Sequence, residues 1–136
     1  MLVVGGGAGG CAVSAKFARR LGEGHVIVLE PSDVHYYQPL FTLAGGGIKT
    51  VEQSRKSTAD VLPKKAKWLK GSAAQFEPDR NAVVTSKGDV INYEYLLIAV
   101  GLELNYDKVR ARRCSFFVCL KIIKSLLNLH HLARKM

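Results

Sequence analysis

The chain has 136 residues, 48% of them hydrophobic and 23% charged, a composition typical of one globular domain with a single core. No run of about 18 uncharged apolar residues occurs, which excludes a membrane-spanning helix. The net charge of +9 divides unevenly: residues 1–108 hold 13 Lys and Arg against 11 Asp and Glu, whereas residues 109–136 hold 7 against none, so the main body lacks the basic character of a nucleic-acid-binding protein.

The first thirty residues predict a strand, a helix and a second strand in direct succession. In the middle segment, Val13, Phe17 and Leu21 are four residues apart and share one helix face. Gly22 to Gly24 then end the helix. This order is that of a βαβ unit, so two parallel strands are expected. The predicted elements are a strand at Leu2 to Val4, a helix at Ala8 to Leu21 and a strand at His25 to Leu29.

The rest of the main body predicts a loop, an antiparallel excursion and a last parallel strand. Pro31 to Gly47 mixes aromatic residues, prolines and glycines, which indicates a long structured loop that serves a site. Ser57 to Leu62 is expected to form a short helical turn. Leu96 to Val100 is a continuous apolar run, typical of a strand buried on both faces of a parallel sheet, and Gly101 ends it. Between them, turn-forming links join three antiparallel strands: Ala66 to Ala74, Ala82 to Thr85 and Val90 to Tyr93.

The glycine-rich start has the spacing of a dinucleotide-binding motif. Gly5, Gly7 and Gly10 fit G-x-G-x-x-G between a strand and a helix, the context in which the pattern is informative. The glycines allow a tight turn, close approach of a pyrophosphate and close helix packing, while the helix N-terminus attracts the phosphates. Glu30 follows 20 residues after Gly10, where a carboxylate accepts hydrogen bonds from a ribose 2′-OH and disfavours a 2′-phosphate. The alternative is a solvated glutamate beside a glycine-rich turn.

Three stretches resemble a known family. "VVGGGAGG", "VIVLEPSDVHYYQPLFTLAGGG" and "YEYLLIAVG" resemble the N-terminal FAD domain of sulfide:quinone oxidoreductases, particularly the mitochondrial type, among the two-dinucleotide-binding-domain flavoproteins. The resemblance covers Met1 to about Lys108 and selects FAD over NAD. The expected fold is therefore α/β, a Rossmann-like FAD/NAD(P)-binding domain at residues 1–108 with a parallel sheet, a crossover helix and an antiparallel three-stranded excursion, incomplete relative to the family.

The resemblance also assigns cofactor contacts by position. It places Ala8 and Gly9 at the pyrophosphate, Glu30 at the adenosine ribose and Ala73 near the adenine. Ala99 and Gly101 match a pair of small residues that lets the chain pass close to the cofactor. The full set of expected FAD-binding residues is Gly5, Gly7, Ala8, Gly9, Gly10, Glu30, Gln38, Ala73, Ala99 and Gly101.

The family's activity is the oxidation of sulfide, with electrons passing through FAD to ubiquinone. Its redox-active cysteines, second nucleotide-binding domain and membrane-binding region match nothing in this chain, so we expect a fragment that binds dinucleotide weakly and is inactive alone. The resemblance implies peripheral association with the mitochondrial inner membrane, although no targeting segment is expected in these residues. Two alternatives stay open: a fragment of another flavin-dependent NADH:quinone reductase, and a non-catalytic membrane-associated fragment.

The cysteines and the C-terminal segment carry no predicted chemistry. Cys11, Cys114 and Cys119 have neither disulfide-framework nor zinc spacing, and none is expected to be catalytic. Residues 109–136 depart from the family and have the pattern of a basic amphipathic helix, which would suit an anionic membrane. The alternative is an altered transcript or gene model with an unselected ending. His130 and His131 lack a third ligand nearby, so no metal site is expected.

Overall fold

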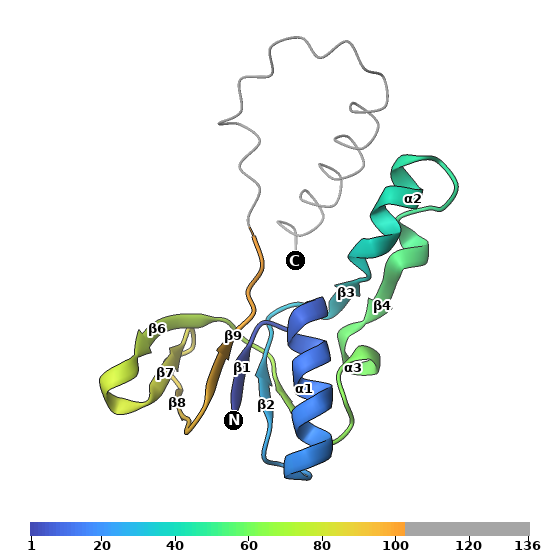
Figure 1. The fold of residues 1–136 in the computed structure, drawn as a ribbon. Coiled ribbons are helices and arrows are strands. Elements are labelled where there is room, and N and C mark those ends of the chain that lie inside the picture. Colours follow the sequence, from blue (N-terminus) through green and yellow to red (C-terminus); the bar gives the residue numbers. More distant parts are fainter. Residues whose placement is uncertain (103–136) are drawn as a thin grey trace, which may run out of the picture. The chain divides into compact units, whose positions relative to one another are not determined.

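The computed structural model describes residues 1–102 (Figure 1). The predicted amphipathic helix at 109–136 and the cysteines within it therefore lie outside the described residues. Contacts divide the described chain into two compact units, one formed by residues 1–36 and 56–101 and one that takes in residues 37–55. The division of the chain at residue 108 stays a prediction.

The first unit is built on a four-stranded sheet with the strand order β5-β2-β1-β9. All three neighbouring pairs are parallel, and Val3 of the inner strand β1 lies opposite Val28 on one side and Leu97 on the other. Helix α1 (Ala8–Leu21) joins β1 to β2 and runs alongside them (Figure 1). The predicted βαβ unit and parallel sheet are confirmed. The four strands are β1 (Leu2–Val4), β2 (Ile27–Leu29), β5 (Lys67–Leu69) and β9 (Leu96–Ile98).

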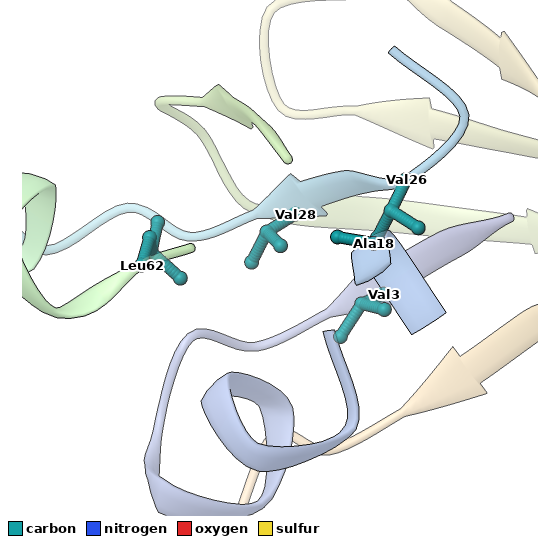
Figure 2. Close-up of a cluster of buried hydrophobic side chains, with 5 residues drawn as sticks. All are labelled: Val3, Ala18, Val26, Val28 and Leu62. Carbon is teal, nitrogen blue, oxygen red and sulfur yellow. The ribbon is translucent and has the colours of Figure 1, made fainter. Parts of the chain in front are cut away.

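This sheet has a cluster of buried side chains on each face. Two clusters arise because successive side chains of a strand point to opposite faces. The side chains of Val3, Ala18, Val26 and Val28 gather between α1 and the strands, as Figure 2 shows. A second cluster, on the opposite face, includes a residue of strand β7. The first cluster consists of Val3, Ala18, Val26, Val28 and Leu62. The second consists of Leu2, Val4, Leu29 and Val83.

Helix α1 buries its small residues more deeply than the apolar residues that were expected to share one face. Val13 and Phe17 are half-buried, and Leu21 is 46% exposed. Small residues, also four apart, line the buried side instead, and their size lets the helix lie close to the sheet. These residues are Gly10, Ser14 and Ala18.

A three-stranded antiparallel sheet, order β6-β7-β8, follows the parallel strand β5. The excursion was predicted correctly, but its first strand was not. Ala66 to Ala74 is divided: its first half forms β5 and pairs in parallel with β2, whereas β6 begins only at Ala73. Gly71 lies at the break and donates its N–H to the Glu30 carbonyl (3.3 Å). The three strands are β6 (Ala73–Glu77), β7 (Ala82–Thr85) and β8 (Val90–Asn92).

The segment predicted as an irregular loop contains short regular elements. Strand β3 (Val34–Tyr36) forms a two-stranded sheet with β4 (Arg55–Ser57). The predicted helical turn is present as α3 (Thr58–Val61). No helix in residues 1–102 has the length and apolar character needed to cross a membrane. The remaining elements are helix α2 (Phe41–Gly45) and three 3₁₀ turns at Gln38–Leu40, Glu52–Ser54 and Pro78–Arg80.

Strand β9 is less buried than its apolar sequence predicts. It pairs with β1 as expected, but it lies at the end of the strand order and stops at Ile98. Ile98 is 56% exposed and Val100 is 67% exposed. The prediction of a strand buried on both faces was therefore wrong for these side chains.

Candidate dinucleotide-binding site

The loop between β1 and α1 presents unpaired backbone amides. Helix α1 begins after Gly7 with no side chain capping it and no acidic residue in its first turn. Gly7, Ala8 and Gly9 are exposed. Among the described residues, the N–H groups of these three positions have no hydrogen-bond partner. Free amides at the positive end of a 14-residue helix form a site suited to an anion such as a phosphate.

The glycines of this loop have two different roles. A Cβ atom on Gly10 would lie 1.8 Å from the Gly5 carbonyl oxygen, so only glycine fits there. Gly5 has φ +104°, and a Cβ on it would meet the Ala99 carbonyl oxygen at 2.4 Å. Gly7 and Gly9, in contrast, have nothing within 4 Å of the Cβ position. Gly5 and Gly10 are thus required by the chain's own packing, while Gly7 and Gly9 leave open space in front of the amides.

Glu30 follows β2 and is fixed against this loop. Its Oε2 accepts the Gly6 N–H at 2.6 Å, and its Oε1 accepts the Ser32 N–H at 2.8 Å. The main chain of Glu30 is also held, since its carbonyl accepts the indole N–H of Trp68 at 2.9 Å. The predicted acid is therefore brought next to the glycine loop. Two carboxylate oxygens have lone pairs to spare for further donors such as ribose hydroxyls.

Two residues with no predicted role hold the other side of Gly6. The Gly6 carbonyl accepts the thiol of Cys11 at 3.1 Å and lies 3.2 Å from Nδ1 of His35, which is buried. A carbonyl oxygen only accepts, so the hydrogen bond needs the proton on Nδ1. No residue spacing signals this contact, because a single histidine bound to a backbone carbonyl leaves no repeating pattern in the sequence.

The position of Cys11 at the start of α1 does not make it a reactive thiol. Burial, and secondarily the negative charge of Glu30, raise the pKa of Cys11 above its ordinary value. A helix N-terminus alone would lower a thiol pKa. Desolvation is the larger of the two causes that raise this pKa, and Cys11 packs against the first core cluster.

We predict that alkylation of Cys11 by iodoacetamide stays slow at neutral pH and reaches its half-maximal rate above the ordinary cysteine pKa of about 8.5. The folded state holds this thiol proton more tightly than the unfolded state. Any contribution of the protonated Cys11 thiol to stability is therefore complete below the pKa of the unfolded chain. It is lost as the pH rises through the raised pKa of the folded chain. Mass spectrometry of the Cys11 peptide across pH measures the rate, and a plateau near pH 7 would contradict the assignment.

The remaining predicted residues are placed differently. Ala99 donates its N–H to the Val4 carbonyl at 2.7 Å, and its own carbonyl faces Gly5, so it belongs to the loop's surroundings. Gly101 is exposed with φ +73°. Ala73 is half-buried at the start of β6 and packs against the second core cluster. Gln38 is exposed and belongs to the second unit. The cofactor contacts of all these residues stay predictions.

The donor set in this part of the chain suits a diphosphate rather than a metal. No group of three or more His, Cys, Asp or Glu side chains that could hold a metal ion occurs in residues 1–102. Open glycine amides and a carboxylate fixed beside them instead match the two polar parts of an adenosine diphosphate, its phosphates and its ribose. The residues present therefore fit the adenosine half of a dinucleotide cofactor.

This chain is similar to known proteins in sequence and in fold. The chain is 44% identical over 111 residues to the mitochondrial sulfide:quinone oxidoreductase of Dictyostelium discoideum, covering 81% of this chain and 25% of the relative. It is 42% identical over 110 residues to the corresponding protein of Mus musculus, again over 81% of this chain and 24% of the relative. The chain thus spans about a quarter of the length of these relatives.

A solved structure has a similar fold. The crystal structure of the sulfide:quinone oxidoreductase from Aquifex aeolicus superposes with a TM-score of 0.72 and 25% identity, covering 98% of this chain and 32% of that chain. Residues 1–114 match the sequence profile of the family described as pyridine nucleotide-disulphide oxidoreductase. The glycine loop, the parallel sheet and these similarities together show that the chain belongs to the pyridine nucleotide-disulphide oxidoreductase family, with mitochondrial sulfide:quinone oxidoreductases among its relatives.

Proposed function

We propose that this chain binds the adenosine diphosphate half of FAD, as part of a flavin-dependent oxidation of sulfide with quinone as electron acceptor. Its membership of an FAD-binding oxidoreductase family supports the choice of cofactor. Relatives named sulfide:quinone oxidoreductases support the choice of substrates. The observation that carries the proposal is the open glycine loop beside a fixed carboxylate.

The diphosphate would lie in front of the exposed amides of Gly7, Ala8 and Gly9. A side chain at Gly7 or Gly9 would project into space that the described residues leave empty, and no acidic side chain in the first turn of α1 repels an anion. Glu30 would accept hydrogen bonds from the ribose, because its carboxylate is held next to the same loop through the Gly6 N–H. These residues bind and orient the cofactor, and bound FAD would supply the redox chemistry.

We further propose that this chain alone does not turn over sulfide. Within residues 1–102, Cys11 is the one free cysteine, and its thiol is already used to hold the Gly6 carbonyl. A pair of redox-active cysteines, which the resemblance implies for the parent enzyme, has no counterpart among these described positions. The chain would therefore bind cofactor without providing the groups that attack sulfide.

Fluorescence of Trp68, the one tryptophan of the chain, provides the test. We predict that FAD quenches it saturably and that ADP competes with FAD, because the site recognises adenosine, ribose and diphosphate. FMN, which lacks the adenosine half, should not compete, and NADP⁺ should bind more weakly than NAD⁺ because of the Glu30 charge. Adding sulfide and ubiquinone should give no quinol. Absence of quenching up to millimolar FAD, or equal competition by FMN, would contradict the proposed site, and quinol formation would contradict the inactivity.

The mitochondrion is the proposed compartment, supported by the relatives named mitochondrial. Peripheral contact with the inner membrane is a separate proposal that depends on residues 109–136, outside the described part of the chain. The alternative of another NADH:quinone reductase shares the same early architecture, and no contact among the described residues favours it over the sulfide:quinone oxidoreductases.

A further inference from the structure

The peptide group that joins Gly6 to Gly7 is held on its carbonyl side by two side chains. Nδ1 of His35 lies 3.2 Å and Sγ of Cys11 lies 3.1 Å from the Gly6 carbonyl oxygen. His35 is only 8% exposed, so water has little access to replace its hydrogen bond. The preceding peptide is fixed as well, because the Gly6 N–H donates to Glu30.

The direction of the Gly6 carbonyl sets the direction of the next amide. The C=O of Gly6 and the N–H of Gly7 belong to one planar peptide, and none of the described peptide bonds is cis, so these two groups point in opposite directions. With the carbonyl directed at His35 and Cys11, the Gly7 N–H points away from them. Gly7 is exposed and has open space at its Cβ position.

The orientation of the Gly6–Gly7 peptide has to be stabilised by other groups, because glycines stand on both sides of it. Gly6 and Gly7 have no Cβ to restrict their dihedral angles, so rotation of the peptide between them costs little by itself. A rotated peptide would present the carbonyl oxygen, in place of the N–H, to an anion in front of the loop. Hydrogen bonds to the Gly6 carbonyl stabilise the orientation that donates.

We infer that His35 is a positioning residue for the diphosphate of the cofactor: by donating from Nδ1 to the Gly6 carbonyl, it keeps the Gly7 amide directed at the ligand. This inference rests on the proposed FAD-binding function. His35 touches no phosphate itself and acts through the Gly6–Gly7 peptide. Cys11 supports the same carbonyl with a weaker thiol donor.

Substitution of His35 separates this role from a general effect on folding. In His35→Leu the donor is lost and a buried carbonyl keeps only its thiol partner, so FAD should bind about tenfold more weakly. In His35→Asn the amide N–H stands close to the position of Nδ1, and affinity should return to within about threefold of the original chain. His25→Leu is the matched control, since His25 is exposed and lies outside the loop. Quenching of Trp68 fluorescence by FAD measures the affinity. The titration is done without urea, after each variant has been shown to be folded.

The outcomes distinguish the inference from the proposed function. If the unmodified chain binds no FAD, the proposed function fails and this inference fails with it. If the unmodified chain binds FAD but His35→Leu binds it equally well, or His35→Asn is as weak as His35→Leu, the inference alone is overturned. A long-range ¹H–¹⁵N spectrum of the unmodified chain, with the histidines neutral, checks the hydrogen bond even where a variant does not fold. Nδ1 should carry the proton, and a proton on Nε2 alone would overturn the inference.

Discussion

Replacement of Gly10 by alanine should destabilise the chain by about 3 kcal/mol or more, the upper range for overpacking a tight site. The added Cβ would lie 1.8 Å from the Gly5 carbonyl oxygen and 2.9 Å from the Gly5 carbonyl carbon. Neither atom can move aside easily, because Gly5 has a positive φ and its Cα faces the Ala99 carbonyl. Either α1 must move off the sheet or the loop must refold. Urea unfolding followed by Trp68 fluorescence measures the loss of stability.

The neighbouring glycine provides a control in which the same change should have the opposite sign. A Cβ on Gly9 meets nothing within 4 Å, and alanine is favoured over glycine in a helix by about 1 kcal/mol. Gly9→Ala should therefore leave the free energy of unfolding unchanged or raise it. Its methyl group would nevertheless occupy space in front of the amides, so FAD affinity should fall. Equal stability of Gly10→Ala and Gly9→Ala would contradict the packing argument.

The glycine loop could be predicted because its requirements are local. The spacing of Gly5, Gly7 and Gly10 between an apolar strand and a helix follows from backbone sterics, and the structure shows the crowding at Gly5 and Gly10 directly. The position of Glu30 followed from the length of a βαβ unit, because the end of β2 must return to the same sheet edge as the end of β1. Both predictions depended on short-range geometry.

The division of the Ala66 to Ala74 segment could not be predicted in the same way. Its sequence favours an extended chain throughout, and only pairing partners distant in sequence decide which sheet each half joins. Residues Lys67 to Leu69 pair with β2, whereas the residues from Ala73 onward pair with β7. Strand propensity describes a fit to a pleated surface and does not specify the neighbour.

The depth to which α1 buries its residues is not marked by its largest apolar side chains. Val13, Phe17 and Leu21 share one face through their spacing of four, but spacing alone does not say how deeply each side chain is buried. A helix that lies close to a parallel sheet instead buries its smallest side chains, and Ser14 is fully buried with its hydroxyl donating to the Cys11 carbonyl at 3.0 Å. The role inferred for His35 was also invisible in the sequence, because its partner is a backbone carbonyl that any residue provides.

Replacement of Glu30 by alanine should reduce both stability and FAD affinity. The buried Gly6 N–H would lose its acceptor, which costs about 1–3 kcal/mol, and the half-buried Ser32 N–H would lose its acceptor too. The proposed hydrogen bonds from the ribose to a charged carboxylate would also disappear, so FAD should bind about a hundredfold more weakly. Urea unfolding and FAD titration, both read from Trp68, measure the two effects on the same chain.

Two further variants separate the contributions of Glu30. Glu30→Gln keeps one carbonyl oxygen for the buried Gly6 N–H and loses only the acceptor of the half-buried Ser32 N–H, so most of the stability should return. Its amide has only one acceptor where the carboxylate has two, so FAD affinity should stay low. Glu23→Ala, at an exposed position after α1, is the matched control and should change neither quantity. If Glu30→Gln restored stability and FAD affinity alike, the carboxylate would serve only to hold the loop, and the ribose would have to be recognised elsewhere.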